Sequence, residues 1–397
     1  MRWRVLAVLL LLLGAAAAWN YLRPIPAVAP VAELGTSILV AGSAPALPWP
    51  DTGSGAVSVS GLGFIASSGN EQAIPAASVT KVMTALLILE DKPLAKGDAG
   101  STVTMSEVDV QSYFADFANN ESVVVVRNGE QLTELQLLEG LLIPSANNYA
   151  QTLARWDSGS VAAFVDKMNA RAAALHMTHT KFADASGASP QSVSTPSDLL
   201  AVGIEAMKQD VFAEIVAMES VVLPVAGTVY NVDYTLGQSG IVGIKTGSGL
   251  SSGANFLFAA TLTVDSYPVT VYGCVMGLPT LDVAFASARS LIGVMESTLH
   301  IRRVIARNQT VASITTPWGA QTDVVSSVDV DLVEWPGMIL RQELRAGSVV
   351  VDQPIAPGTK EGTEHLVLGD YSLDVPLVTA SPLYPPGRLW RLTRTSF

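Results

Sequence analysis

A helical spacing of apolar positions dominates the middle of the chain. Apolar residues recur every three or four positions and predict helices over four ranges: 77–90, 132–156, 161–175 and 281–299. The first range is apolar almost throughout, so we expect a helix buried on all sides. Ser197-Asp198, after Pro196, is typical of the N-cap that opens another helix.

Strand-like runs lie on both sides of this helical middle. Residues 56–66 precede the helical ranges, and three runs lie between the third and the fourth helical range: 241–245, 254–264 and 268–276. The last two are joined by Asp265-Ser266-Tyr267, as in a β-hairpin. Strands from both ends therefore predict an α+β domain over 52–300, with an antiparallel sheet and an all-α insertion.

The residues before and after this domain have a different pattern. Residues 23–51 are rich in Pro, Ala and Gly, lack periodicity and predict a linker. From residue 301 to 397, short alternating runs separated by turn residues predict a small all-β domain. These runs are 310–315, 323–333, 338–344, 348–351, 365–368 and 372–378.

The N-terminus has the pattern of an export signal. Two arginines precede an unbroken apolar run over 5–18, so residues 1–22 are a signal peptide or an N-terminal membrane anchor. Ala16-Ala17-Ala18 fits a cleavage site, whereas Trp19 and Tyr21 fit the outer interface of an uncleaved anchor. Both alternatives place the protein outside the cytoplasmic membrane, either held at its outer face or secreted.

Charge and cysteine content exclude several classes of function. The net charge of −12 argues against nucleic acid as a partner. Cys274 is the only cysteine and lies in an apolar run, which predicts a buried thiol and excludes an internal disulfide. His176 and His179 have no acidic or cysteine neighbours that would complete a metal site. We therefore expect neither a metal nor a cofactor.

Ser78-Val79-Thr80-Lys81 is the first of three short motifs that indicate acyl-serine chemistry. A serine hydroxyl needs an adjacent base, and residues i and i+3 of a helix share a face, so Lys81 can activate Ser78. An apolar helix also lowers the pKa of a lysine towards the neutral form that a base requires. We therefore expect Ser78 to be the nucleophile.

Ser145-Ala146-Asn147 is the second motif, between two helical stretches. A hydroxyl there can relay a proton to a leaving amine, and a carboxamide can hold a substrate amide and the lysine. Ser145 and Asn147 are accordingly candidate catalytic residues.

Lys245-Thr246-Gly247 is the third motif and ends a predicted strand. An ammonium and a hydroxyl there can bind a substrate carboxylate, and the glycine leaves room for substrate along the strand. The backbone N–H of Ser248 can join that of Ser78 as an oxyanion hole. Lys245, Thr246, Gly247 and Ser248 are the expected substrate-binding residues.

With these motifs the chain resembles the low-molecular-weight penicillin-binding proteins, specifically the serine-type D-Ala-D-Ala carboxypeptidases of peptidase family S11. The resemblance covers about 56–299 and includes segments around and between the motifs: 75–84, 145–150, 164–169, 175–182 and 243–247. It implies a β-lactamase/transpeptidase-like catalytic domain, and the small β domain fits the family's second domain. We do not expect the family's usual C-terminal amphipathic anchor in the segment 388–394, which is too short for a membrane-binding helix.

The resemblance also implies a reaction and a role for each motif. The terminal D-alanine of a peptidoglycan stem pentapeptide would be removed, and β-lactams would acylate the same serine. The implied roles are acyl-enzyme formation for Ser78, base for Lys81, control of protonation for Ser145 and Asn147, and carboxylate binding for Lys245 and Thr246. Asn148 and Asp184-Ala185-Ser186-Gly187 depart from the family's usual residues, as does Ser248-Gly249-Leu250.

Three alternatives use the same motifs. A class A β-lactamase needs a deacylating glutamate in an E-x-x-x-N loop, and no glutamate between Asn147 and Lys245 precedes an asparagine by four residues. A non-catalytic wall-binding or regulatory protein that keeps the fold is the second alternative. Endopeptidase action on cross-linked peptides is the third.

Overall fold

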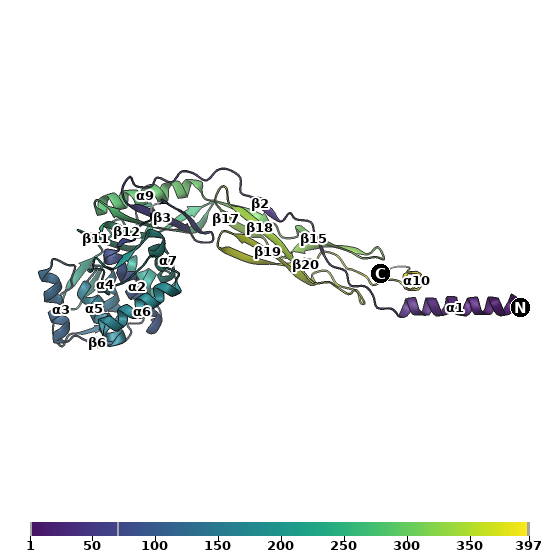
Figure 1. Ribbon diagram of the computed structural model, residues 1–397, viewed down its shortest axis with the longest axis horizontal. Coiled ribbons are helices and arrows are strands. Elements are labelled where there is room, and N and C mark those ends of the chain that lie inside the picture. Colours follow the sequence, from purple (N-terminus) through teal and green to yellow (C-terminus); the bar gives the residue numbers. More distant parts are fainter. Residues whose placement is uncertain (1, 70, 395–397) are drawn as a thin grey trace. The chain divides into compact units, whose positions relative to one another are not determined.

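The computed structural model describes residues 2–69 and 71–394. The chain forms two compact units, whose elements are labelled in Figure 1. One unit is Pro45–Leu299, and the other combines the N-terminal segment up to Ala44 with the segment from His300 onward.

The unit Pro45–Leu299 is built on a five-stranded antiparallel sheet. Its order is β11-β12-β13-β3-β4, which confirms a sheet assembled from both ends around a helical insertion. The run predicted over 56–66 is two strands joined by a turn, because Gly61 has a φ of 82° and reverses the chain. The strands are β3 (Ser54–Val59), β4 (Gly63–Ser67), β11 (Ile241–Gly249), β12 (Gly253–Val264) and β13 (Tyr267–Leu278).

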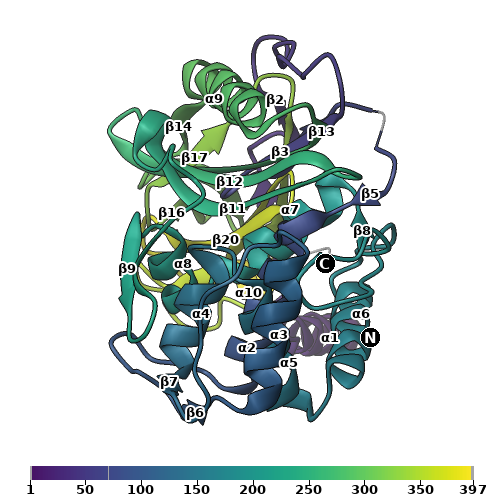
Figure 2. The ribbon, with the colours of Figure 1, turned by 90° about the vertical axis from the view of Figure 1, so that its left-hand side faces the viewer.

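The predicted hairpin is confirmed, with a tighter turn than expected. Val264 pairs with Tyr267, so only Asp265 and Ser266 form the turn. Both have positive φ, 46° and 75°, as a two-residue turn matching the twist of the strands requires. Helix α9 (Leu281–Thr298) covers one face of this sheet, and α7 (Pro196–Ala206) packs against the other (Figure 2).

Helix α2 (Lys81–Asp91) is the centre of the helical insertion. Its residues 81–89 are all buried, which confirms the prediction from its apolar sequence. A 3₁₀ turn, η1 (Ala77–Thr80), precedes it directly. The packed helices around it are α4 (Glu134–Leu142), α5 (Asn147–Ser158), α6 (Val161–Ala174) and α7 (Figure 2).

Two helix boundaries differ from the prediction. The range 132–156 contains β7 (Gln131–Thr133), α4 and α5, since the chain turns at residues 143–146. Helix α7 begins at Pro196, and its N-cap is Thr195, whose hydroxyl accepts a hydrogen bond from the Asp198 N–H. The predicted N-cap at Ser197 is therefore wrong by two residues.

Several elements of this unit were not predicted. Helix α3 (Glu107–Ala118) is opened by a capping box of Ser106 and Asp109. Val110 and Tyr113 pack partly buried against the core while Phe114 and Phe117 are exposed, so the apolar positions mark its buried face poorly. The others are short: α8 (Asp210–Val216), η2 (Gln238–Gly240), β5 (Ile74–Pro75), β6 (Thr102–Thr104), β8 (Val193–Ser194), β9 (Ser220–Leu223) and β10 (Gly227–Tyr230).

The other unit contains a seven-stranded antiparallel sheet in the order β1-β15-β16-β20-β19-β18-β2, and a ribbon of β14 and β17. The predicted run 323–333 is two strands, and 348–351 contributes only a bridge between Val349 and Val28. The later strands are β14 (His300–Ile305), β15 (Thr310–Thr315), β16 (Gln321–Ser326), β17 (Val330–Glu334), β18 (Ile339–Arg345), β19 (Lys360–Leu368) and β20 (Tyr371–Thr379).

The segment predicted as a linker, 23–51, is partly a component of this sheet. It supplies the two edge strands, β1 (Val31–Ala32) and β2 (Ser37–Leu39), and belongs to the β unit up to Ala44. Strands this short are held by backbone hydrogen bonds to β15 and β18, so their side chains need not alternate. The linker prediction is corrected accordingly.

The first and last helices that the structure describes belong to the same unit and pack together. Helix α1 (Arg2–Leu22) includes Trp3–Leu22, which is long and apolar enough to cross a membrane. A short helix, α10 (Arg388–Thr393), packs against it, and the guanidinium of the following Arg394 donates to the carbonyls of Asn20, Arg23 and Pro24.

In the other unit, Cys274 is buried on β13, as predicted.

Candidate active site

Ser78 lies on η1, where a left-handed residue bends the chain into α2. Ala77 has a φ of 48°, and the Asn255 amide donates to the carbonyls of Pro75 and Ala76. The Asn255 Oδ1 accepts from the Gly277 N–H, so this one side chain ties the serine turn to two strands of the sheet. Asn255 belongs to no recognised motif and was not predicted.

Lys81 is the first residue of α2 and lies beside Ser78. Its Nζ is 2.8 Å from the Ser78 Oγ and 2.8 Å from the Ser186 carbonyl oxygen. The side chain is fully buried. Burial lowers the pKa of Lys81 well below its ordinary value, and the positive charge of Lys245 lowers it further. Three carboxylates oppose this shift, those of Asp184, Glu121 and Asp116.

The carbonyl that receives Lys81 belongs to a tightly bonded loop. The Asp184 carboxylate accepts from the Ser186 and Ala188 N–H groups and from the hydroxyls of Ser186 and Ser192. Gly187 has a φ of 81°, and a Cβ there would lie 1.8 Å from the Ala77 carbonyl oxygen. The departure from the family pattern at 184–187 therefore forms a loop that packs directly on the serine turn.

Ser145 and Asn147 lie at the turn from α4 to α5. Both are buried, and Ser145 has a φ of 68°. Among the described residues, neither the Ser145 Oγ nor the Asn147 Oδ1 has a hydrogen-bond partner. Buried polar atoms without partners are rare and costly, so both are suited to contacts with a bound substrate.

Asn148, which replaces the family's aspartate, has a structural role. Its side chain accepts from the Val124 N–H at 3.1 Å and donates to the Val124 carbonyl at 2.8 Å. Only a carboxamide offers both functions to one backbone residue, since a carboxylate cannot donate. With the bond from the Asn147 N–H to the Ser122 carbonyl, it clamps the 121–124 loop against α5.

The third motif runs along β11 past the serine turn. Lys245 and Thr246 are buried, and Gly247 is so close to the turn that a Cβ would lie 3.0 Å from the Ser78 N and 3.1 Å from the Ala76 carbonyl oxygen. Burial lowers the pKa of Lys245 to about 7, although Asp233 opposes the shift.

A cleft of about 540 Å³ opens over these residues. Ser78, Asn147 and Ser248 line it, while Lys81, Ser145, Lys245 and Thr246 are buried. Gly187 and Ala188 also line it, as does Glu121, whose carboxylate accepts a hydrogen bond from the Asn147 Nδ2. Glu121 was not predicted, because no pattern links it to Asn147.

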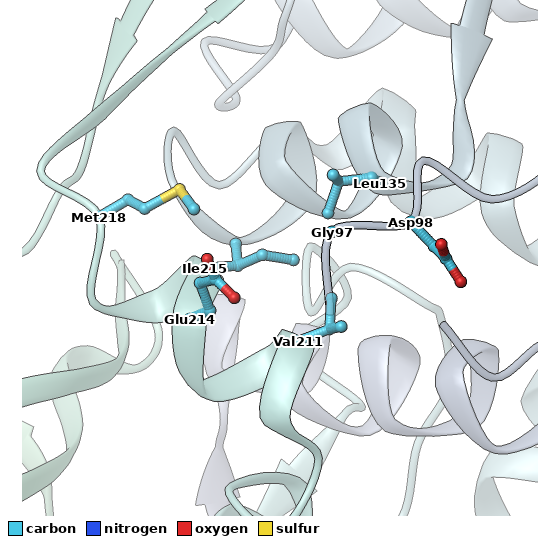
Figure 3. A pocket seen from close by; sticks show the side chains of 7 residues that line it. All are labelled: Gly97, Asp98, Leu135, Val211, Glu214, Ile215 and Met218. Atoms are coloured by element: carbon cyan, nitrogen blue, oxygen red, sulfur yellow. The ribbon is translucent and has the colours of Figure 1, made fainter. Parts of the chain in front are cut away.

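A second pocket lies away from the motifs. It is small and mainly apolar, lined by Val211, Ile215 and Met218 with Leu135 (Figure 3). It contains none of the motif residues, so the larger cleft is the candidate active site.

The family described as D-alanyl-D-alanine carboxypeptidase matches residues 62–279. A D-alanyl-D-alanine carboxypeptidase of Streptomyces sp. strain K15 is 32% identical over 204 residues, covering 46% of this chain and 67% of that protein. The D-alanyl-D-alanine carboxypeptidase DacB2 of Mycobacterium tuberculosis is 35% identical over 193 residues, covering 47% of this chain and 62% of the relative.

Solved structures are similar over larger parts of the chain. The Streptomyces K15 DD-transpeptidase is 26% identical, with a TM-score of 0.55, covering 64% of this chain and 98% of its own. A peptidoglycan synthesis regulatory factor, PBP3, of Streptococcus pneumoniae is 19% identical, with a TM-score of 0.63, covering 83% of this chain and 98% of its own. The second likeness concerns the fold alone and confirms the predicted fold class.

Proposed function

Because the chain belongs to peptidase family S11, the serine-type D-alanyl-D-alanine carboxypeptidases, we propose that it removes the terminal D-alanine from peptidoglycan stem peptides through an acyl-enzyme on Ser78. The observation that carries the proposal is the 2.8 Å contact between the Ser78 Oγ and the Nζ of the fully buried Lys81, at the wall of a cleft. A buried lysine with a lowered pKa is suited to act as a base.

Acylation begins when neutral Lys81 takes the hydroxyl proton of Ser78. The Ser78 Oγ then attacks the carbonyl carbon of the penultimate D-alanine, and the backbone N–H groups of Ser78 and Ser248 hold the developing oxyanion. As the C–N bond breaks, the Ser145 hydroxyl gives its proton to the leaving amine and recovers one from Lys81. D-Alanine leaves, and the remaining peptide is esterified to Ser78.

Lys245 and Thr246 are assigned to the terminal carboxylate. An ammonium and a hydroxyl from consecutive buried residues of β11 would offer a carboxylate charge-assisted hydrogen bonds away from bulk water. The same pair would accept the carboxylate of a β-lactam, whose ring amide Ser78 would open. The expected products are a hydrolysed stem peptide and, with β-lactams, a covalent adduct.

We place this reaction outside the cytoplasmic membrane, where peptidoglycan lies. Support comes from α1, whose apolar stretch Trp3–Leu22 is exposed and suits a signal sequence or an anchor. An anchor would hold the protein at the outer face of the membrane. A cleaved signal would release it to the cell wall.

The carboxylate assignment is tested by comparing two pentapeptides that end in D-Ala-D-Ala. The peptide with a free carboxylate is expected to release D-alanine, measured by a D-amino-acid oxidase assay. The same peptide with an amidated C-terminus is expected to be cleaved at least about 10²-fold less efficiently, because Lys245 loses its ion pair. Equal cleavage of both peptides would contradict the assignment, and no release from either would contradict the proposed function.

A further inference from the structure

The wall of the cleft carries a single ionisable side chain among its described lining residues, that of Glu121. The other lining residues are serines, glycines, alanines, asparagines, prolines and a leucine. The two lysines of the motifs are buried behind this lining. Among these lining residues, Glu121 is therefore the one whose side chain can exchange a proton with a molecule in the cleft.

Glu121 is held against the second motif from two sides. Its Oε2 accepts from the Asn147 Nδ2, and its N–H donates to the Asp116 carbonyl at 3.0 Å. The next residue, Ser122, accepts from the Asn147 N–H at 2.7 Å. The carboxylate therefore has a defined position between Asn147 and the cleft.

The neighbouring carboxylates, those of Asp116 and Asp184, accept more hydrogen bonds than that of Glu121. Asp116 accepts two hydrogen bonds from the Gln151 amide, and Asp184 accepts four from its own loop and Ser192. Within the described chain, the side chain of Glu121 makes one hydrogen bond, to Asn147. Its remaining acceptor capacity is available to a group in the cleft.

Four groups determine the charge of Glu121. Burial raises its pKa, and the carboxylates of Asp116 on α3 and Asp184 raise it further. The ammonium of Lys81 on α2 and the hydrogen bond from Asn147 on α5 lower it. The net shift is upward, which makes the ionised carboxylate a stronger base than an ordinary glutamate.

This inference rests on the proposed function. We infer that Glu121 is the general base that activates water to hydrolyse the acyl-enzyme on Ser78. Lys81 is buried beside the serine hydroxyl and does not line the cleft, whereas water would reach the ester carbonyl through the cleft, which Ser78 and Glu121 both line. A cleft of about 540 Å³ has room for a peptide segment and a water molecule, which takes about 30 Å³.

The step balances as an ester hydrolysis. The water oxygen bonds to the acyl carbonyl carbon while one of its protons passes to the Glu121 carboxylate. The bond between the carbonyl carbon and the Ser78 Oγ then breaks, and the proton returns through the site to the Ser78 oxygen. The products are a peptide carboxylic acid and the free serine. The glutamate missing from the E-x-x-x-N loop is thus supplied by the loop after α3.

The test is Glu121→Gln, which keeps an acceptor for the Asn147 amide but removes the base. Deacylation is expected to slow by about 10²-fold, within the range of general-base catalysis. With a slowly hydrolysed penicillin, the adduct would persist about 10²-fold longer in intact-protein mass spectra. With a pentapeptide, at a pH where Lys81 is neutral, kcat and KM would fall together and leave kcat/KM unchanged, because kcat/KM reports acylation.

Asp116→Asn is the matched control. It also removes one negative charge that acts on Lys81, but from a residue outside the cleft lining. Above the acidic limb, its deacylation rate is expected to stay within a few-fold of the wild type, and the limb itself to move to lower pH, because the charge of Asp116 raises the pKa of Glu121. The pH profile separates the roles further: wild-type deacylation is expected to fall in acid, with a limb above pH 4.5 that Glu121→Gln lacks.

Three outcomes are decisive. If the wild type forms a penicillin adduct but Glu121→Gln loses it at the same rate, the inference is wrong and the proposed function stands. If Glu121→Gln raises only the KM for peptides with a free amine, Glu121 binds substrate and the inference is also wrong. If the folded wild type forms no adduct and releases no D-alanine, the proposed function is wrong, and the inference about Glu121, which rests on it, is wrong as well.

Discussion

Replacing Lys81 with methionine is expected to slow acylation of Ser78 by about 10³- to 10⁴-fold without unfolding the protein. Methionine is unbranched and of similar length, so it fits a fully buried position on α2. It leaves the Ser78 hydroxyl without the proposed base, whose Nζ now lies 2.8 Å away. The Ser186 carbonyl also loses the hydrogen bond that the Lys81 Nζ donates, which lowers the stability of the fold but removes no other contact of Ser78.

The measurement is the rate of labelling by a fluorescent penicillin, with circular dichroism to confirm folding. Lys96→Met is the control, since it makes the same substitution on a side chain that is 75% exposed. It is expected to label at the wild-type rate. Labelling of Lys81→Met within tenfold of the wild type would mean that another group activates Ser78.

Replacing Lys245 with methionine is expected to reduce kcat/KM for a pentapeptide by about 10²- to 10³-fold, mainly through KM. A substrate carboxylate would then be buried beside Thr246 without its counter-charge, and losing one partner of such a pair costs several kcal/mol, roughly 2–5. Thr246→Val is the matched comparison, because it removes the neighbouring hydroxyl and keeps the charge.

The pH dependence of kcat/KM shows whether each lysine works in its neutral or its charged form. In the proposed mechanism Lys81 acts when neutral, so efficiency is expected to rise with pH through its lowered pKa. Lys245 would bind when charged, so efficiency is expected to fall above about pH 7. In Lys245→Met the alkaline limb is expected to disappear. The acidic limb is expected to move to higher pH, because the charge of Lys245 lowers the pKa of Lys81. An unchanged alkaline limb in this variant would exclude Lys245 as its source.

Much of the catalytic domain could be predicted because its signals are local. The i, i+3 spacing of Ser78 and Lys81 follows from helical geometry, and the apolar sequence of α2 accounts for its burial. The antiparallel sheet followed from the order of strands and helices along the chain. Family resemblance then assigned roles that spacing alone does not specify.

The unpredicted features depend on contacts between distant segments. Glu121 contacts Asn147 because Asn148 holds the 121–124 loop through both backbone groups of Val124. Such a contact leaves no periodic pattern in the sequence. Asn255 fixes the serine turn across a separation of 179 residues. Strands β1 and β2 are held by backbone hydrogen bonds, which leave no apolar pattern in the sequence.

The most direct test of the account is the covalent state of Ser78 after the protein has been incubated with benzylpenicillin. Intact-protein mass spectrometry is expected to show one penicilloyl group per chain, and peptide mapping to place it on Ser78. The folded Ser78→Ala variant is expected to carry none. A folded wild-type protein that forms no adduct, or an adduct that maps elsewhere and persists in Ser78→Ala, would contradict the assignment of Ser78 as the nucleophile.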